Sequence, residues 1–307
     1  MRQNIDACAK QVDEIVCVDN GSKNISEIER FLDETQKAPG GRNVGDRGVQ
    51  ASQCHSKNIC IRLIKNHENL GIARALNQIL LYARDRGYKW TLSLDQDSVI
   101  LPGLLNDYEQ IIAECKRKKE TDQEAVASNK LAMLTTIYQD RNSTLKAMTN
   151  GEYEEVSECI TSASYANVDV LLEVGGYDEK MFIDFVDYDI CATLREHGYK
   201  IARNNKTELV HEVGKARTVS LFGVKTNVHN ESAFRKYYQT RNHLYYIKKH
   251  KSSVNKLVEY RRIVKLCILT LLYKDDRWNK LKAMYRGVRD SHEMKKTLNR
   301  QEKKVNE

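Results

Sequence analysis

Lys89-Trp-Thr-Leu-Ser-Leu-Asp-Gln-Asp-Ser98 is the stretch on which the fold assignment depends. Apolar residues alternate through it, which predicts a β-strand, and that strand ends in two carboxylates one residue apart. In an α/β sheet, side chains at the carboxyl end of a strand line the crevice where ligands bind. Asp95 and Asp97 could converge there on one hard cation, Mg²⁺ or Mn²⁺, with room left for phosphate oxygens. The alternative is an ordinary strand followed by a polar turn, because this spacing of aspartates is common.

Strands and helices are predicted to alternate along the first hundred residues. Residues 14–19 and 59–64 have the composition of buried strands, while 25–32 and 72–86 show helical periodicity. Such alternation predicts an α/β fold with a mostly parallel central sheet flanked by helices. The Gly-rich, polar run 36–58 is expected to form a long surface loop.

The pattern changes towards the end of the chain, where it becomes entirely helical. We therefore divide the chain into an α/β domain, residues 1–230, and a basic helical extension, residues 231–307. Within the first of these, further helices are expected at 4–11, 103–119, 168–174 and 186–197, and further strands at 125–137, 153–161, 200–203 and 208–211.

Positive charge is concentrated in the tail. Residues 248–307 carry 18 Lys or Arg and 7 Asp or Glu, a net charge of +11, whereas the whole chain has +8, so residues 1–247 are net −3. This distribution argues against a nucleic-acid-binding protein. The eight cysteines include no C-x-x-C pair, as is typical of free thiols in a reducing cytoplasm. The longest apolar run, 263–273, is too short to cross a bilayer, which takes about 20 residues.

A series of short motifs follows one another in a specific order. Together they resemble the inverting glycosyltransferases of family 2, especially bacterial rhamnosyltransferase-like members. The resemblance covers about residues 10–250 and depends on the order of the motifs, since each alone is weak. The motifs are Val18-Asp19-Asn20-Gly21-Ser22, Asn69-Leu70-Gly71-Ile72-Ala73 with Asn77, Leu94-Asp95-Gln96-Asp97-Ser98, Thr161-Ser162-Ala163, Val174-Gly175-Gly176-Tyr177-Asp178, Phe182 to Asp189, His211-Glu212-Val213-Gly214, and Tyr237-Tyr238 to Arg241-Asn242.

The resemblance implies a glycosyltransferase-A fold, with the α/β domain as the catalytic domain. It also implies the inverting transfer of a sugar from a nucleotide donor to a cell-surface polysaccharide or a lipid-linked acceptor. L-Rhamnose carried by dTDP is the favoured donor, and a UDP-sugar is the alternative. A non-catalytic remnant of such an enzyme is a further alternative.

Carboxylates carry the expected chemistry. A carboxylate on the face opposite the leaving diphosphate can remove the proton of the acceptor hydroxyl, and the resemblance assigns this role to Asp187. It assigns the binding of Mg²⁺ or Mn²⁺ to Asp97, Asp95 and His211, because a divalent cation offsets the charge that grows on the diphosphate. For Asp187 the alternative is a helix N-terminus that favours acids, and for His211 a surface or capping histidine.

The other expected site residues divide between the two substrates. The resemblance places Asp19 at the nucleobase and small residues near the sugar and acceptor. Arg74 and Arg241 are assigned to the donor, although both could be ordinary surface arginines. The donor-binding set is Asp19, Asn20, Asn69, Gly71, Arg74, Asp95 and Arg241, and the acceptor-side set is Ser162, Ala163, Asp184 and Asp189.

One feature of the family is not found. Family members begin with a strand and a Thr-Tyr-Asn-like loop that forms half of the nucleotide pocket, whereas Met1 falls inside the first predicted helix. That strand is usually central in a doubly wound sheet, so without it ladder groups would be unpaired. We expect an N-terminally truncated form with weakened donor binding, and the coding DNA upstream of Met1 would test this.

The tail, residues 250–300, has apolar residues at helical spacing and Lys or Arg on the other face. A basic amphipathic helix can lie on a membrane surface, which would suit a lipid-linked acceptor. The alternative is a helical cap packed on the α/β domain. The expected location is therefore the cytoplasm, with possible peripheral contact at the inner face of the cell membrane.

Overall fold

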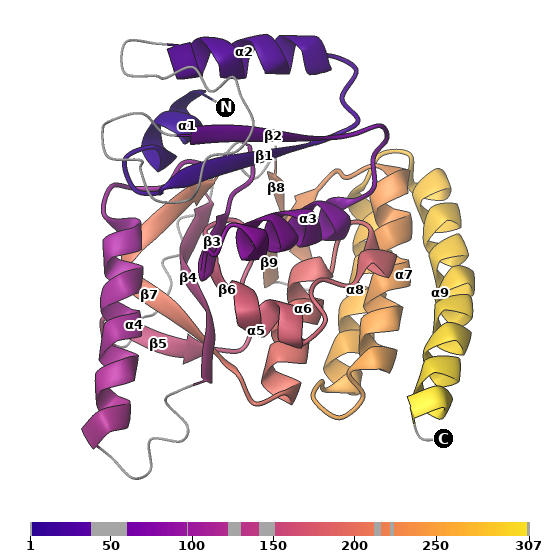
Figure 1. Cartoon of the computed structure of the whole chain (residues 1–307). Helices are drawn as coiled ribbons and strands as arrows, with labels where there is room; N and C mark the ends of the chain where they lie inside the picture. The colour runs from indigo at the N-terminus through magenta and orange to yellow at the C-terminus, as the bar shows by residue number, and fades with distance from the viewer. Residues whose placement is uncertain are drawn as a thin grey trace.

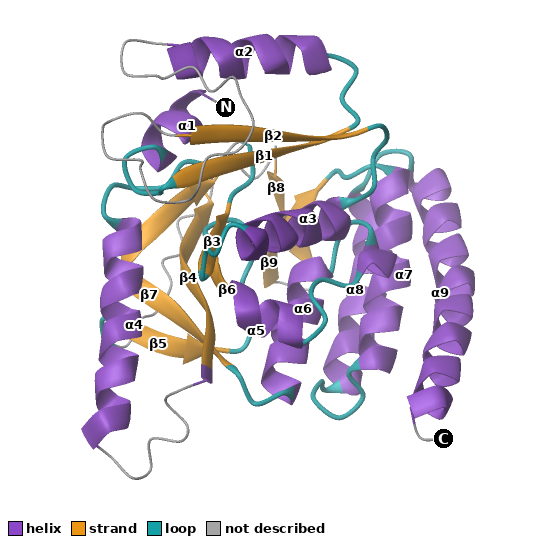
Figure 2. Ribbon diagram, in the orientation of Figure 1, coloured by secondary structure: helices purple, strands orange, loops and turns teal. Residues whose placement is uncertain are grey.

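The computed structural model describes residues 2–37, 60–96, 98–121, 130–140, 151–211, 216–221 and 224–305. Strands occupy the middle of the structure and helices surround them, with three long helices side by side along one flank (Figures 1 and 2). The expected surface loop at 36–58 lies almost wholly outside the described residues.

The N-terminal layer is a two-stranded parallel sheet. Its order is α1 (Arg2–Cys8), β1 (Glu14–Asn20), α2 (Ile25–Lys37) and β2 (Cys60–Asn66). β1 and β2 pair in register from Glu14 with Cys60 to Asn20 with Asn66. Ile5, Leu32 and Ile61 bury their side chains together, which holds both helices on this sheet. The strands predicted at 14–19 and 59–64 are confirmed.

A second sheet of five strands carries the strand that ends in Asp95. It has the order β3-β6-β4-β7-β5, formed by β3 (Trp90–Ser93), β6 (Ser164–Asn167), β4 (Leu131–Asp140), β7 (Lys200–His211) and β5 (Tyr153–Val156). The mostly parallel sheet expected from the sequence is corrected here, because β6 runs antiparallel to both β3 and β4, and β5 runs antiparallel to β7. The reason is two short strands, β5 and β6, of which β6 lies where the sequence predicted no strand.

Helices cover both sides of this sheet. They are α3 (Ile72–Asp85), α4 (Leu104–Thr121), α5 (Val168–Glu173) and α6 (Val186–Glu196). α3, α5 and α6 bury Leu76, Leu171 and Ile190 in the largest hydrophobic core, while Tyr108 of α4 belongs to a second one. The helical periodicity seen in the sequence therefore marks the faces that are buried.

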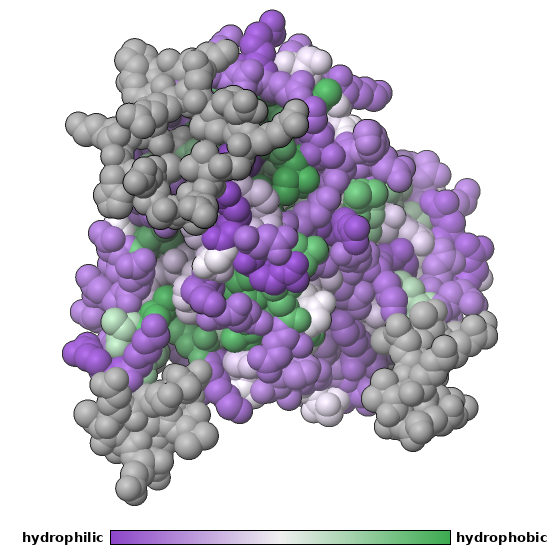
Figure 3. Space-filling model, in the orientation of Figure 1, coloured by the Kyte–Doolittle hydropathy of each residue, from purple (hydrophilic) through white to green (hydrophobic). Residues whose placement is uncertain are grey.

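The C-terminal part consists of a hairpin and three helices. β8 (Ala216–Leu221) and β9 (Val224–His229) form an antiparallel pair that the sequence analysis missed. The predicted helical region is α7 (Ala233–Lys249), α8 (Lys256–Tyr273) and α9 (Arg277–Val305). The visible face of α9 is largely hydrophilic (Figure 3). No helix in the described part of the chain is long and apolar enough to cross a membrane.

The two sheets are not joined by a backbone ladder in the described part of the chain. β1 pairs with β2 alone, and β3 is the edge of the five-stranded sheet. A cavity of about 560 Å³ lies between them, lined by the whole of β1 and the whole of β3. Its lining includes apolar side chains such as Val16, Val18 and Leu92, and among its polar residues are Asp19, in β1, and Asp95, just after β3.

Gly71, just ahead of α3, is required by close packing. Its φ is +86°, and an added Cβ would lie 2.6 Å from the carbonyl oxygen of Phe182. Gly87 has φ +79° but nothing within 4 Å of the same position. We expect Gly71→Ala to lower the free energy of unfolding by about 3 kcal/mol, since backbone strain and a clash act together. Gly87→Ala, with strain alone, should cost about 1 kcal/mol. Urea unfolding of both variants measures the difference, and equal losses would contradict the packing argument.

Candidate active site

The end of β3 is fixed by the small-residue turn at 162–163. The amide of Asp95 donates to Oγ of Ser162 (3.2 Å), and the amide of Ala163 donates to the carbonyl of Ser93 (2.8 Å). Ala163 has φ 61°, a left-handed conformation in which its carbonyl accepts a hydrogen bond from the Tyr108 hydroxyl. The loop that carries Asp95 and the Ser162–Ala163 turn are therefore adjacent.

Asp187 lies in the first turn of α6, close to other carboxylates. Burial raises its pKa to about 6 from the ordinary 3.8, although backbone amides donate to it. The negative charges of Asp184 and Asp95 raise the pKa further. One of the amide donors is that of Tyr188, 3.0 Å from Oδ1. The fold thus brings the Asp95 loop and the start of α6 together.

Asp184 is held against α7. Its side chain is 11% exposed and forms an ion pair with the guanidinium of Arg235. Asp184 itself has φ 64°, a backbone conformation that residues other than glycine seldom adopt. Because both its backbone and its carboxylate are constrained, Asp184 has a fixed position relative to Asp187.

The side chains of two of the three expected metal ligands are outside the described part of the structure. Asp97 lies outside the described residues, and only the backbone of His211 is described, at the end of β7 opposite Asp140 of β4. β3, β4 and β7 run in the same direction. His211, at the carboxyl end of β7, therefore lies at the same end of the sheet as Asp95, which follows the carboxyl end of β3. Among the side chains that are described, no group of three or more His, Cys, Asp or Glu is arranged to hold a metal ion.

Four of the expected donor-side residues hold two loops together at the ends of β1 and β2. Oδ2 of Asp19 accepts the amides of Gly21 (3.1 Å) and Ser22 (3.0 Å). Burial would raise the pKa of Asp19, but its hydrogen bonds from Ser22 and Gly21 lower it below the ordinary value.

The side chain of Asn20 contacts the next loop. Its Nδ2 donates to the carbonyl of Gly71 (3.1 Å), and its Oδ1 accepts from the backbone amide of Leu70 (3.2 Å). Oδ1 of Asn69 accepts from the backbone amide of Gly71 (3.0 Å). Asp19 and Asn20 line the same cavity as Asp95. The sequence motifs are therefore neighbours in space.

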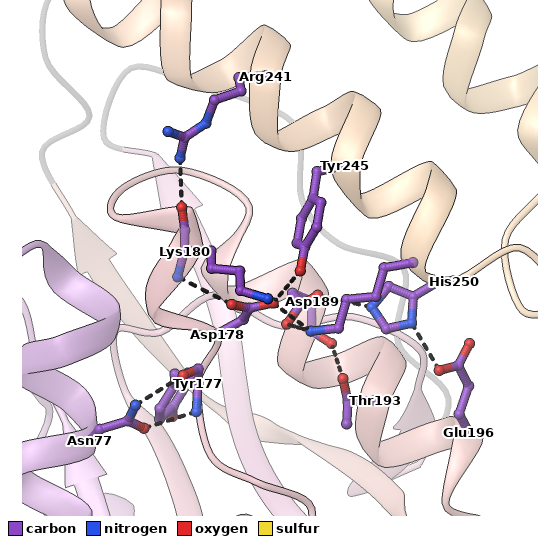
Figure 4. Close-up of polar contacts among 11 residues, drawn as sticks. Asn77, Tyr177, Asp178, Lys180, Asp189, Thr193, Glu196, Arg241, Tyr245 and His250 are labelled. Atoms are coloured by element: carbon purple, nitrogen blue, oxygen red, sulfur yellow. Dashed lines mark hydrogen bonds and ion pairs between the residues drawn. The ribbon is translucent and has the colours of Figure 1, made fainter. Parts of the chain in front are cut away.

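The two arginines expected at the donor are engaged with protein groups. Arg74 forms an exposed ion pair with Glu179 (2.9 Å). Arg241 donates to the carbonyl of Lys180 (2.6 Å), and its guanidinium lies 4.6 Å from the centre of the Tyr238 ring. Arg241 reaches this carbonyl because α7 packs beside the 3₁₀ turn Glu179–Met181 (Figure 4).

Asp189 is corrected from an acceptor-side residue to an interior one. Its side chain is 1% exposed, and its two oxygens contact Nζ of Lys249 (2.8 Å) and Nε2 of His250 (2.9 Å). The physical reason is the helix geometry, because residues two apart on a helix do not share a face. Asp189 therefore points away from Asp187 and into the molecule.

Sequence reasoning missed the network that contains Asp189 (Figure 4). Lys249 bridges Asp189 and Asp178, and it lowers the pKa of Asp178 below the ordinary value against the effect of burial. His250 lies between Asp189 and Glu196, with each ring nitrogen 2.9 Å from a carboxylate oxygen. Lys249-His250 at the end of a helix is a weak signal, since charged residues there usually face solvent.

Breaking this network should be costly. Asp189→Ala leaves the buried His250 and the half-buried Lys249 each without one of their partners, so we expect the free energy of unfolding to fall by about 3–5 kcal/mol. Asp169→Ala is the control, because it removes an ion pair with Lys89 that is 60–71% exposed and should cost less than about 1 kcal/mol. Urea unfolding of the two variants measures both values. Similar losses would show that the buried contacts add nothing.

Comparison with known proteins connects this geometry to a family. Residues 1–114 match the model of glycosyl transferase family 2. The dTDP-rhamnosyl transferase RfbF of Shigella flexneri is 26% identical over 242 residues, which are 74% of this chain and 76% of that protein.

Two solved structures share the fold. The mannosyltransferase PcManGT from Pyrobaculum calidifontis, solved in complex with GDP-Man and Mn²⁺, has a TM-score of 0.51 at 13% identity, over 94% of this chain and 68% of that one. S. aureus TarS 1-349 has a TM-score of 0.51 at 13% identity, over 94% and 76%. At this identity both show the fold alone, which is the expected α/β fold.

Proposed function

The N-terminal 114 residues belong to glycosyltransferase family 2 and the chain is a glycosyltransferase of the A-type fold, and from this premise we propose an inverting transfer with Asp187 as general base. The observation that carries the proposal is the gathering of Asp187, Asp184 and Asp95 where the Asp95 loop meets the start of α6. A sugar would pass from a nucleotide donor to a hydroxyl group of a saccharide acceptor.

Asp187 has the properties that a general base needs. A pKa of about 6 makes the carboxylate ionised at neutral pH and still basic enough to accept a proton. It would take the proton of the acceptor hydroxyl as the oxygen attacks the anomeric carbon, while the bond to the diphosphate breaks on the opposite face. Inversion at the anomeric carbon follows from that arrangement.

The residues at the carboxyl ends of β3 and β7 suit a divalent cation. The negative charges of Asp95 and Asp184 raise the pKa of Asp187, which a nearby cation would offset, and hard oxygen ligands are those that Mg²⁺ and Mn²⁺ prefer. Asp95, Asp97 and His211 would hold the ion. When bound, it supplies a positive charge that offsets the charge on the leaving diphosphate.

The donor is proposed to be dTDP-L-rhamnose, with a UDP-sugar as the alternative. Support comes from the 26% identity to the dTDP-rhamnosyl transferase RfbF of Shigella flexneri. In this proposal Asp19 and Asn20, which line the cavity at the carboxyl end of β1, bind the nucleoside beside the Gly71 loop.

Asp187→Asn should abolish transfer and yet stabilise the protein. Loss of a general base costs about 10²–10⁴-fold in rate. The raised pKa, about 6 against 3.8, means that the folded state binds the proton more tightly than the unfolded state. The wild-type free energy of unfolding therefore falls as pH rises from about 4 to 6, by about 3 kcal/mol in all, and the neutral amide escapes this loss.

The measurement combines two assays at pH 5 and pH 8. Hydrolysis of dTDP-L-rhamnose or a UDP-hexose is followed with Mn²⁺ and with a chelator, and urea unfolding is followed in parallel. The wild-type rate should rise about tenfold per pH unit below about pH 6 and level off above it. Asp85→Asn, at an exposed carboxylate, is the control and should change neither assay. A fully active Asp187→Asn would exclude the base assignment.

The acceptor is proposed to be lipid-linked, which would place the cytoplasmic protein at a membrane surface. α8 supports this, because Leu257 (69%), Val264 (57%) and Leu271 (41%) are exposed and recur every seven residues, on one face of the helix. Basic residues such as Arg261 and Lys265 are exposed on the same helix. An apolar stripe with basic neighbours can enter the headgroup region of anionic lipids.

Binding to vesicles tests the role of α8. Leu257→Ser combined with Val264→Ser should weaken flotation with anionic vesicles by at least about tenfold, since two apolar side chains no longer enter the lipid. Leu81→Ser on α3, at a side chain 42% exposed, is the matched control and should float like the wild type. Equal flotation of all three proteins would argue against a membrane contact through α8.

A further inference from the structure

The loop from Met181 to Phe185 has an unusual backbone. Phe182 (φ 55°), Asp184 (φ 64°) and Phe185 (φ 68°) all lie in the left-handed region, and none is glycine. Each such residue costs about 1–3 kcal/mol, so the surrounding structure must hold the loop in place. The loop leads directly into α6, whose first turn carries Asp187.

One side chain satisfies the carbonyl groups that this backbone turns inward. The carbonyls of Met181, Ile183 and Asp184 lie 2.5, 2.7 and 2.9 Å from Nδ2 of Asn242, which donates to them. Asn242 is fully buried in α7, and its Oδ1 accepts from Nε of Arg241 (2.9 Å). Two amide hydrogens are thus shared among three acceptors, of which the carbonyl of Met181 also accepts the backbone amide of Ile183 (2.6 Å).

The same loop is tied to the donor side of the molecule. The carbonyl of Phe182 accepts the amide of Ile72 (2.7 Å), the first residue of α3, next to the close contact at Gly71. Arg235 of α7 holds the carboxylate of Asp184. A shift of the loop would therefore move the start of α3 and the start of α6 together.

We propose that Asn242 is the positioning residue that fixes the Met181–Phe185 loop and thereby sets where the Asp184 and Asp187 carboxylates lie. The inference rests on the proposed role of Asp187 as base and adds a residue that does not itself touch substrate. Asn242 is suited to this position because its amide supplies donors where a carboxylate would place a fourth oxygen against three carbonyls. An apolar residue would remove this side-chain donor from all three carbonyls, and a loss of about 1–3 kcal/mol is expected for each of the two, Ile183 and Asp184, that it leaves unpaired.

Asn242→Ala tests the proposal, and Thr240→Ala is the matched control. Thr240 is also buried in α7, but its hydroxyl donates to the backbone carbonyl of Lys236 in the same helix. It therefore serves the helix and not the loop. Both variants lose a buried polar group, so both should unfold at lower urea concentration. Only Asn242→Ala should alter the surroundings of Asp187.

The decisive measurement follows the Asp187 carboxyl by ¹³C NMR across pH, with Asp187→Asn used to assign its signal. We expect the midpoint to fall by at least about one pH unit in Asn242→Ala, because water reaches the carboxylate and Asp184 moves away. It should stay unchanged in Thr240→Ala. An unchanged midpoint in folded Asn242→Ala overturns the proposal. If that variant does not fold, Asn242→Ser, which keeps one donor, is titrated instead, and an unchanged midpoint there has the same meaning.

Kinetics provide a second readout. If Asp187 is the base, kcat for transfer from dTDP-L-rhamnose should fall about 10²-fold in Asn242→Ala, since a misplacement near 1 Å is enough for such a loss, with a smaller change in the donor KM. A kcat equal to that of Thr240→Ala would overturn the proposal. The titration needs no substrate, so it still tests the role of Asn242 if Asp187 is not the general base. A wrong base assignment would be recognised separately, because Asp187→Asn would then be active.

Discussion

The ammonium group of Lys249 lies between the carboxylates of Asp178 and Asp189, at 3.0 and 2.8 Å, and the arrangement of the site depends on it. A half-buried cation with two anionic partners resists displacement, because moving it would leave the carboxylates of Asp178 and Asp189 without their counter-charge. Lys249 thereby fastens the end of α7 to α6 and to the segment before the 3₁₀ turn. α7 in turn presents Asn242 and Arg235 to the loop that precedes Asp187.

This attachment bears on how the chain is divided. A boundary at residue 230 would separate α7 from the domain whose core it completes, since Tyr245, Tyr246 and Ile247 are buried in the largest hydrophobic cluster together with residues of α3 and α6. α8 and α9 make fewer such contributions to that core. The helical part of the chain thus includes one helix that builds the site and two that pack outside it.

Much of the fold could be predicted from periodicity, and the limits of that prediction have physical causes. α3 is predicted correctly because its buried residues recur at helical spacing, and β1 because its residues are mostly apolar. β6 was not predicted, because Ser164-Tyr-Ala-Asn167 is only four residues long and half polar, and this strand runs antiparallel to both of its neighbours. Side-chain partners were harder still. Arg241 and Asp189 find theirs on segments about 60 residues away, and no local pattern encodes such a pairing.

The way in which the β1–β2 layer is joined to the five-stranded sheet also affects local unfolding. In the described part of the chain, the β1–β2 layer is bound to the rest by helix packing and side-chain contacts, without a continuous ladder of backbone hydrogen bonds across the cavity. Backbone ladders couple neighbouring strands, so we expect the two layers to be separate units of local unfolding. The layer that carries Asp19 would then loosen while the layer that carries Asp187 stays folded. If Asp19 binds the nucleotide as proposed, nucleotide affinity would be lost at a lower temperature or denaturant concentration than the structure around Asp187.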